Sequence, residues 1–76
     1  MSNTERCAIG IDIGGTKIAA GLVSPDGKVI QQQRIPTQAH LGGEHVLQTV
    51  RQLIELFLRQ AKALEKTVSG IGIGVA

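Results

Sequence analysis

The change of hydrophobic period along the chain constrains its fold more than any other feature. Between residues 46 and 64, apolar side chains recur every three or four positions, which is the period of one buried helix face. On either side, at residues 7–13 and 68–75, apolar residues alternate with small or polar ones, as in a β-strand. A helix between two such strands predicts a right-handed crossover that makes the strands parallel.

Two further strands are predicted between the first strand and the helix. Residues 17–23 and 29–35 flank a Ser-Pro-Asp-Gly run, which has Pro and Gly where a tight turn requires them. The later segment contains three consecutive glutamines and closes on Pro36, which has no N–H to donate, so we expect it at a sheet edge. The predicted fold is therefore α/β, with the order β-β-β-α-β, a mixed sheet and an antiparallel meander of the first three strands.

Charges and glycines refine the second half of this prediction. Glu44 is expected in the first helical turn and Lys62 and Lys66 near the last turn, as the helix dipole favours. In the strand at 68–75, three glycines alternate with three apolar residues, and this alternation indicates that a helix or another backbone approaches the strand closely.

The size of the chain limits what it does alone. It has 76 residues with one Phe and no Trp or Tyr, and a chain of this length buries only about 60% of its unfolded surface. Small-molecule pockets are usually lined by aromatic and apolar side chains and lie between domains or in the crevices of α/β sheets. We therefore expect an incomplete enzyme. Because the sequence ends at Ala76 in a glycine-rich strand, we also expect a truncated chain.

Charge gives no sign of a nucleic-acid partner. The net charge is +2 and the isoelectric point is about 9.1. Nucleic-acid binders gather Lys and Arg on one face, often beside aromatic side chains. The nearest equivalent is a solvated helix face, interrupted by Glu55, that carries Arg51, Arg59, Lys62 and Lys66.

Cysteine and histidine usage predicts neither a disulfide nor a metal cluster. Cys7 is the only cysteine and starts an apolar run, where a buried small hydrophobe is expected. His40 and His45 lie five positions apart without a Cys or carboxylate set, so we expect a surface role for both. No apolar stretch approaches the roughly 20 residues that cross a bilayer, and no signal peptide is evident. We therefore expect a cytoplasmic protein without a membrane partner.

The residues with the clearest chemistry are Asp12, Gly14, Gly15, Thr16 and Lys17. At a turn between strands, two glycines allow backbone N–H groups to approach an anion closely. The hydroxyl of Thr16 adds a donor and Lys17 adds a positive charge. A carboxylate just before the turn, on Asp12, is placed to bind a hydrated Mg²⁺ that bridges the phosphates.

Other interpretations of the glycines were weighed. A P-loop requires Gly-Lys-Ser/Thr followed by a helix, whereas Lys17 opens a strand. The dinucleotide fingerprint has a different spacing from the glycines at 70–74, which also lie within a strand. A plain hairpin turn remains the alternative for Gly14 and Gly15.

The segment Ile9-Gly10-Ile11-Asp12-Ile13-Gly14-Gly15-Thr16-Lys17 resembles the first phosphate motif of the ROK family of sugar kinases and repressors. The resemblance covers nearly the whole chain in order and spacing, through Ala20-Gly21-Leu22-Val23, Asp26-Gly27-Lys28-Val29, Ile35-Pro36-Thr37 and Gly70-Ile71-Gly72-Ile73-Gly74-Val75-Ala76. Thr37 follows the family pattern, and capping of the loop after Pro36 is the plain structural alternative.

This resemblance implies a ribonuclease H-like, actin-like ATPase fold, of which residues 1–76 are the first part of the small N-terminal domain and the second domain is absent. It implies that Gly14, Gly15, Thr16 and Lys17 lie near the phosphates of ATP and that Asp12 assists Mg²⁺. The family's catalytic base, most sugar-contacting residues and its zinc motif would lie beyond Ala76. No catalytic residue is therefore assigned here, and a zinc site stays open.

Three functions follow as hypotheses. The first is an ATP-dependent hexose kinase, in which a sugar hydroxyl attacks the γ-phosphoryl group, working as a homodimer when intact. The second is a repressor of the same family, which would need a DNA-binding module before the motif, whereas only eight residues precede Ile9. The third is a small non-catalytic module that associates with itself through exposed sheet edges.

Overall fold

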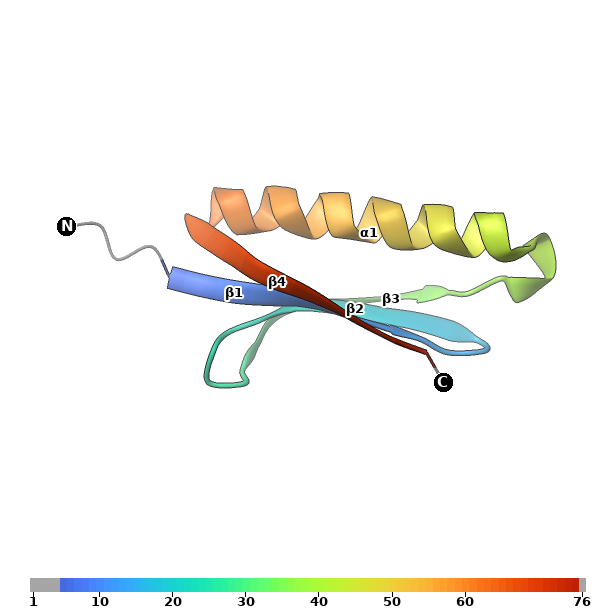
Figure 1. Cartoon of the computed structure of the whole chain (residues 1–76), viewed down its shortest axis with the longest axis horizontal. Helices are drawn as coiled ribbons and strands as arrows, with labels where there is room; N and C mark the ends of the chain where they lie inside the picture. Colours follow the sequence, from blue (N-terminus) through green and yellow to red (C-terminus); the bar gives the residue numbers. More distant parts are fainter. Residues whose placement is uncertain (1–4, 76) are drawn as a thin grey trace.

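The computed structural model describes residues 5–75 as a four-stranded sheet with one long helix along one face (Figure 1). Ala76, which the family resemblance included, lies outside these residues. The elements in chain order are β1 (Glu5–Ile13), β2 (Lys17–Val23), β3 (Val29–Pro36), the 3-10 turn η1 (Ala39–Leu41), α1 (Gly43–Ala63) and β4 (Lys66–Val75).

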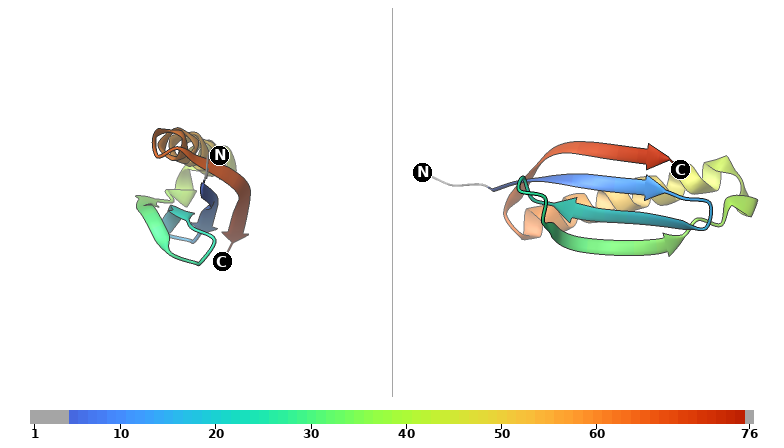
Figure 2. Two further views of the ribbon diagram at one scale, coloured as in Figure 1. Left: turned by 90° about the vertical axis from the view of Figure 1, so that its left-hand side faces the viewer. Right: turned by 90° about the horizontal axis from the view of Figure 1, so that it is seen from below.

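The topology agrees with the sequence-based prediction. The strand order across the sheet is β3-β2-β1-β4, so β3 and β4 form its two edges (Figure 2). β2 is antiparallel to both β1 and β3, whereas β4 is parallel to β1. The β-β-β-α-β order, the mixed sheet and the edge position of the glutamine-rich strand are confirmed.

The core forms between α1 and the sheet face that it covers. Alternate residues of β1 and β2 point toward the helix, and burying such apolar side chains contributes about 1.5–3 kcal/mol each. Phe57 of α1 is the largest fully buried side chain. The buried residues of this cluster are Cys7, Ile9, Ile11, Ile18, Ala20, Leu22, Val50, Leu53, Phe57 and Ala61.

Two details of the helix differ from the prediction. Leu47 and Leu58 share the helical spacing, yet they are exposed, because they lie on the flank of α1 beyond the reach of the sheet. Lys66 does not lie at the helix end. The helix stops at Ala63, Glu65 takes a positive φ of 58°, and Lys66 begins β4 with its Nζ 3.0 Å from Oε1 of Glu5.

The parallel strands start earlier than expected and contain an irregularity. Glu5 pairs with Lys66, two residues ahead of the predicted strand starts. The register shifts between Cys7 and Ala8, and Ser69 is the extra residue, with its hydroxyl donating to the Cys7 carbonyl at 3.2 Å. Such a bulge inserts one residue into a strand and re-aims those that follow.

The turn between β2 and β3 has the predicted form. Gly27 takes a positive φ of 90°, and its N–H donates to the Ser24 carbonyl at 2.9 Å. The Ser24 hydroxyl also donates to the carboxylate of Asp26. This hydrogen bond is the main reason why the pKa of Asp26 lies below its usual value. Within residues 5–75, no helix is long and apolar enough to cross a membrane.

Candidate functional site

The turn between β1 and β2 carries the predicted phosphate-binding residues. It lies at the end of the sheet where β4 also ends and where α1 begins (Figure 2). The N–H of Gly14 donates to the Lys17 carbonyl at 2.9 Å, which closes the turn. A Cβ on Gly14 would stand only 3.0 Å from that same oxygen, so the closure leaves little room for a side chain. Gly14 thus has a steric reason to be glycine.

The tip of this turn presents unpaired backbone donors. Gly15, Thr16 and Lys17 are all exposed. In residues 5–75, no protein acceptor is hydrogen-bonded to the N–H of Gly15 or to that of Thr16. Successive free N–H groups at a turn form a concave donor set suited to anions. The turn therefore offers donors that an anion could use, and phosphate binding by Gly14, Gly15, Thr16 and Lys17 stays a prediction.

Thr37, which the sequence-based reasoning did not select, is hydrogen-bonded to two backbone carbonyls of this turn. The N–H of Thr37 donates to the Thr16 carbonyl at 2.9 Å, and its Oγ1 donates to the Gly14 carbonyl at 2.8 Å. Thr37 is 2% exposed. The expected capping of its own loop is not what its side chain does, since its partner lies 23 positions earlier. The only sequence signal was its place in the family pattern after Pro36.

Asp12 and Lys17 lie on the same face of the sheet. Asp12 pairs with Ala19, and because side chains alternate along a strand, Lys17 points to the same side as Ala19. This face is opposite to α1. On the other side of β1, Asp12 pairs with Gly74, where a Cβ would lie 3.8 Å from Oδ1 of Asp12. A methyl group there would make only an ordinary van der Waals contact, and the carboxylate of Asp12 is exposed to solvent.

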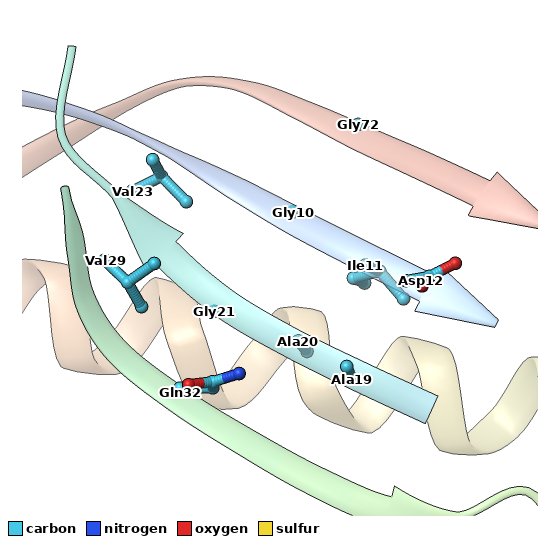
Figure 3. A pocket seen from close by; sticks show the side chains of 10 residues that line it. All are labelled: Gly10, Ile11, Asp12, Ala19, Ala20, Gly21, Val23, Val29, Gln32 and Gly72. Atoms are coloured by element: carbon cyan, nitrogen blue, oxygen red, sulfur yellow. The ribbon is translucent and has the colours of Figure 1, made fainter. Parts of the chain in front are cut away.

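The same face is hollowed beside Asp12. Small residues from three strands leave a shallow hollow of about 350 Å³, with Asp12 near the end of β1 (Figure 3). Its lining is Gly10, Ile11, Asp12, Ala19, Ala20, Gly21, Val23, Val29, Gln32 and Gly72. The turn residues 14–17 do not line the hollow. Asp12 is therefore the one predicted site residue among its lining residues.

The single carboxylate of Asp12 suits a magnesium ion whose other ligands are water molecules and the phosphates of a bound nucleotide. Mg²⁺ keeps several waters and is usually bound through one or two carboxylates plus substrate phosphates. Asp12 supplies one exposed carboxylate on the strand that leads into the turn. No group of three or more His, Cys, Asp or Glu side chains suited to a metal occurs in residues 5–75. Asp12 thus fits an ion that arrives with phosphates.

The two histidines lie away from these residues. His40 is exposed in η1, and the Nε2 of His45 lies 3.1 Å from Oε1 of Gln38. This surface pairing agrees with the expected surface role.

Comparison with known proteins gives consistent relatives. The model of the ROK family matches residues 8–76. A glucokinase of Thermotoga maritima is 38% identical over 64 residues, which are 84% of this chain and 19% of the relative. An N-acetylmannosamine kinase of Escherichia fergusonii is 34% identical over 65 residues, which are 86% of this chain and 22% of the relative.

A solved structure has a similar fold over most of this chain. It is a ROK family glucokinase from Streptomyces griseus in complex with glucose and AMPPNP, with a TM-score of 0.71 and 30% sequence identity. The match covers 92% of this chain and 20% of that one. The chain therefore spans about a fifth of the length of the relatives that it matches.

Proposed function

Since the chain belongs to the ROK family and has part of the actin-like ATPase fold of its glucokinases, we propose that it is the phosphate-binding segment of an ATP-dependent sugar kinase. In this proposal, residues 1–76 are the first part of the small N-terminal domain. The observation that carries it is the exposed Gly-Gly-Thr-Lys turn directly after Asp12, in a chain whose relatives are named glucokinase and N-acetylmannosamine kinase.

Each residue of the site has a separate role in this proposal. The N–H groups of Gly15 and Thr16 donate to oxygens of the ATP phosphates, and Lys17 adds positive charge beside them. The carboxylate of Asp12 would hold the metal ion through its water ligands. Magnesium, when bound, supplies charge that offsets the negative charge on the transferring phosphoryl group. Positioning and electrostatics of this kind account for most of the catalysis in phosphoryl transfer.

The remaining machinery is assigned to the polypeptide outside this segment. We assign no catalytic base to residues 5–75. The base that accepts the proton of the sugar hydroxyl, the residues that contact a hexose and any zinc ligands belong to the rest of the protein. We place the whole protein in the cytoplasm as a homodimer.

The mass of the native polypeptide tests the assignment to a larger protein. The intact product of the native gene should be several times heavier than the 8.0 kDa of this chain. A native mass of 8.0 kDa would leave no room for a second domain, and the kinase proposal would then fail.

The activity itself is tested on that whole polypeptide. With Mg²⁺ and ATP, purified protein should release ADP in the presence of a sugar from a panel that includes glucose, N-acetylmannosamine and fructose. A matching sugar phosphate should appear in equal amount. If no hexose in the panel increased the release of ADP, the proposal would be contradicted.

A second candidate function rests on the free edges of the sheet. β3 and β4 each have one unpaired side, and the helix-facing side chains of β4 beyond its bulge, at Ile71, Ile73 and Val75, are exposed. Unprotected strands invite pairing with another chain. If these 76 residues act alone, a module that associates with itself is the alternative to the kinase.

A further inference from the structure

Thr37 is tied to the phosphate-binding turn by two hydrogen bonds that its own loop does not require. Its N–H donates to the Thr16 carbonyl and its hydroxyl donates to the Gly14 carbonyl, at 2.9 and 2.8 Å. Both acceptors lie in the turn, on either side of Gly15. One buried residue therefore holds the turn at two points.

Holding these two carbonyls also fixes the direction of the neighbouring N–H groups. A peptide unit is planar and trans, so its C=O and the N–H of the next residue point in opposite directions. The Gly14 carbonyl is directed to Thr37, which turns the N–H of Gly15 away from it. The Thr16 carbonyl is held by Thr37 in the same way, so the peptide units on both sides of the one that carries the N–H of Thr16 are fixed.

The environment of Thr37 keeps this arrangement in place. The residue is 2% exposed, so its hydroxyl has little access to water and depends on the Gly14 carbonyl for a partner. A buried polar group left without a hydrogen bond costs about 1–3 kcal/mol. The preceding Pro36 has a fixed φ, which restricts the backbone that brings Thr37 to the turn.

We propose that Thr37 is a positioning residue for the ligand phosphates, which acts by aiming the N–H groups of the turn at them. This inference rests on the proposed function of the turn. It predicts an effect confined to the phosphates, because Thr37 does not itself face the exposed side of the turn. If Thr37 only stabilised the fold, its substitution would instead lower the affinity for every ligand of the protein by a similar factor.

The test uses the whole polypeptide that contains residues 1–76 and isothermal titration calorimetry. Thr37→Val keeps the shape of the side chain and removes the hydroxyl, whereas Thr37→Ser keeps the hydroxyl. Thr37→Val should weaken binding of AMPPNP with Mg²⁺ about tenfold, since misaimed donors lose about the strength of one hydrogen bond. Its affinity for adenosine should stay unchanged, and Thr37→Ser should bind both within about twofold of wild type.

Each outcome decides the matter. Equal AMPPNP affinity in Thr37→Val and wild type, or an equal loss for AMPPNP and adenosine, overturns the inference. If the wild-type protein does not bind AMPPNP, the proposed function is refuted, and the inference about Thr37 is refuted as well. If Thr37→Val does not fold, Thr37→Ala removes the hydroxyl without a clash and serves in its place. Failure of both variants to fold would show a structural role and also overturn the inference.

Discussion

Two glycines that face each other across β1 and β2 show how local packing differs between identical residues. Gly10 and Gly21 are paired in the sheet. A Cβ on Gly21 would lie 2.7 Å from the carbonyl oxygen of Gln31, whereas a Cβ on Gly10 would meet nothing within 4 Å. The clash is with backbone, so it cannot be relieved by a side-chain rotation. Only one of the two positions requires glycine for steric reasons.

Gly21→Ala should therefore destabilise the fold while Gly10→Ala does not. Relief of the clash requires a shift of β3 away from β2, and overpacking of this kind costs about 1–3 kcal/mol. Gly10→Ala adds a methyl group in open space and should change stability by less than about 0.5 kcal/mol. Urea denaturation of the whole polypeptide measures both, and equal stabilities of the two variants would contradict the close contact.

At the scale of elements, α1 and the sheet are held together by one helix face. The face centres on Val50, Leu53 and Phe57. Leu58 follows Phe57 in sequence but lies on the flank of α1, where its side chain is 44% exposed. Neighbouring apolar residues on one helix therefore differ in what they contribute to the core.

Phe57→Ala and Leu58→Ala separate these contributions. Removal of the buried ring leaves a cavity beneath α1 and should cost about 3–5 kcal/mol. Leu58→Ala should cost less than about 1 kcal/mol because the side chain already contacts water. The measurement is the shift in free energy of unfolding of each variant, and a Leu58 effect as large as that of Phe57 would mean that this flank is buried in the whole protein.

Element types and their order were predictable because hydrophobic period reports which face is buried. The 3.6-residue period of α1 and the alternation in β1 and β4 sufficed to predict the parallel pair on either side of a helix. The period could not show which apolar residues the narrow sheet covers, since Leu47 shares the spacing of the buried residues and is nevertheless exposed. It also could not show the bulge at Ser69 or the early strand start at Lys66, because both depend on pairing with β1.

The candidate site was predictable only in part. The local run from Asp12 to Lys17 identified the turn, since glycines and donors adjacent in sequence remain adjacent in space. Thr37 was missed as a support because its two hydrogen bonds join positions more than twenty residues apart. Such contacts arise from the pairing of β2 with β3 and have no local signature.

At the scale of the whole molecule, residues 5–75 include an apolar area on the helix side of the sheet that α1 does not cover. Ile71, Ile73 and Val75 of the edge strand β4 face the helix side of the sheet, yet they remain exposed, and β4 has an unpaired edge. The other edge strand, β3, carries glutamines instead. The two edges of the sheet therefore differ in their tendency to associate.

We expect the isolated 76-residue chain to associate with itself through β4. Ile73→Lys should shift it toward monomer, because a charged side chain on an edge strand opposes strand pairing. Val29→Lys is the matched control, since Val29 is exposed to a similar extent, 58% against 52%, on the opposite edge. Sedimentation velocity measures the distribution, and a monomeric wild-type chain at all concentrations would contradict this expectation.

The most direct test of the central claim is the turnover number of the whole polypeptide for sugar phosphorylation, measured for Asp12→Ala. Asp12 is exposed, so its removal should leave the melting temperature unchanged, and Asp26→Ala provides an exposed aspartate outside the site as control. Loss of the carboxylate that orients the metal should lower kcat by about a hundredfold or more, while Asp26→Ala stays near wild type. A folded Asp12→Ala protein with near-normal kcat would show that this turn does not serve the phosphates of ATP as proposed.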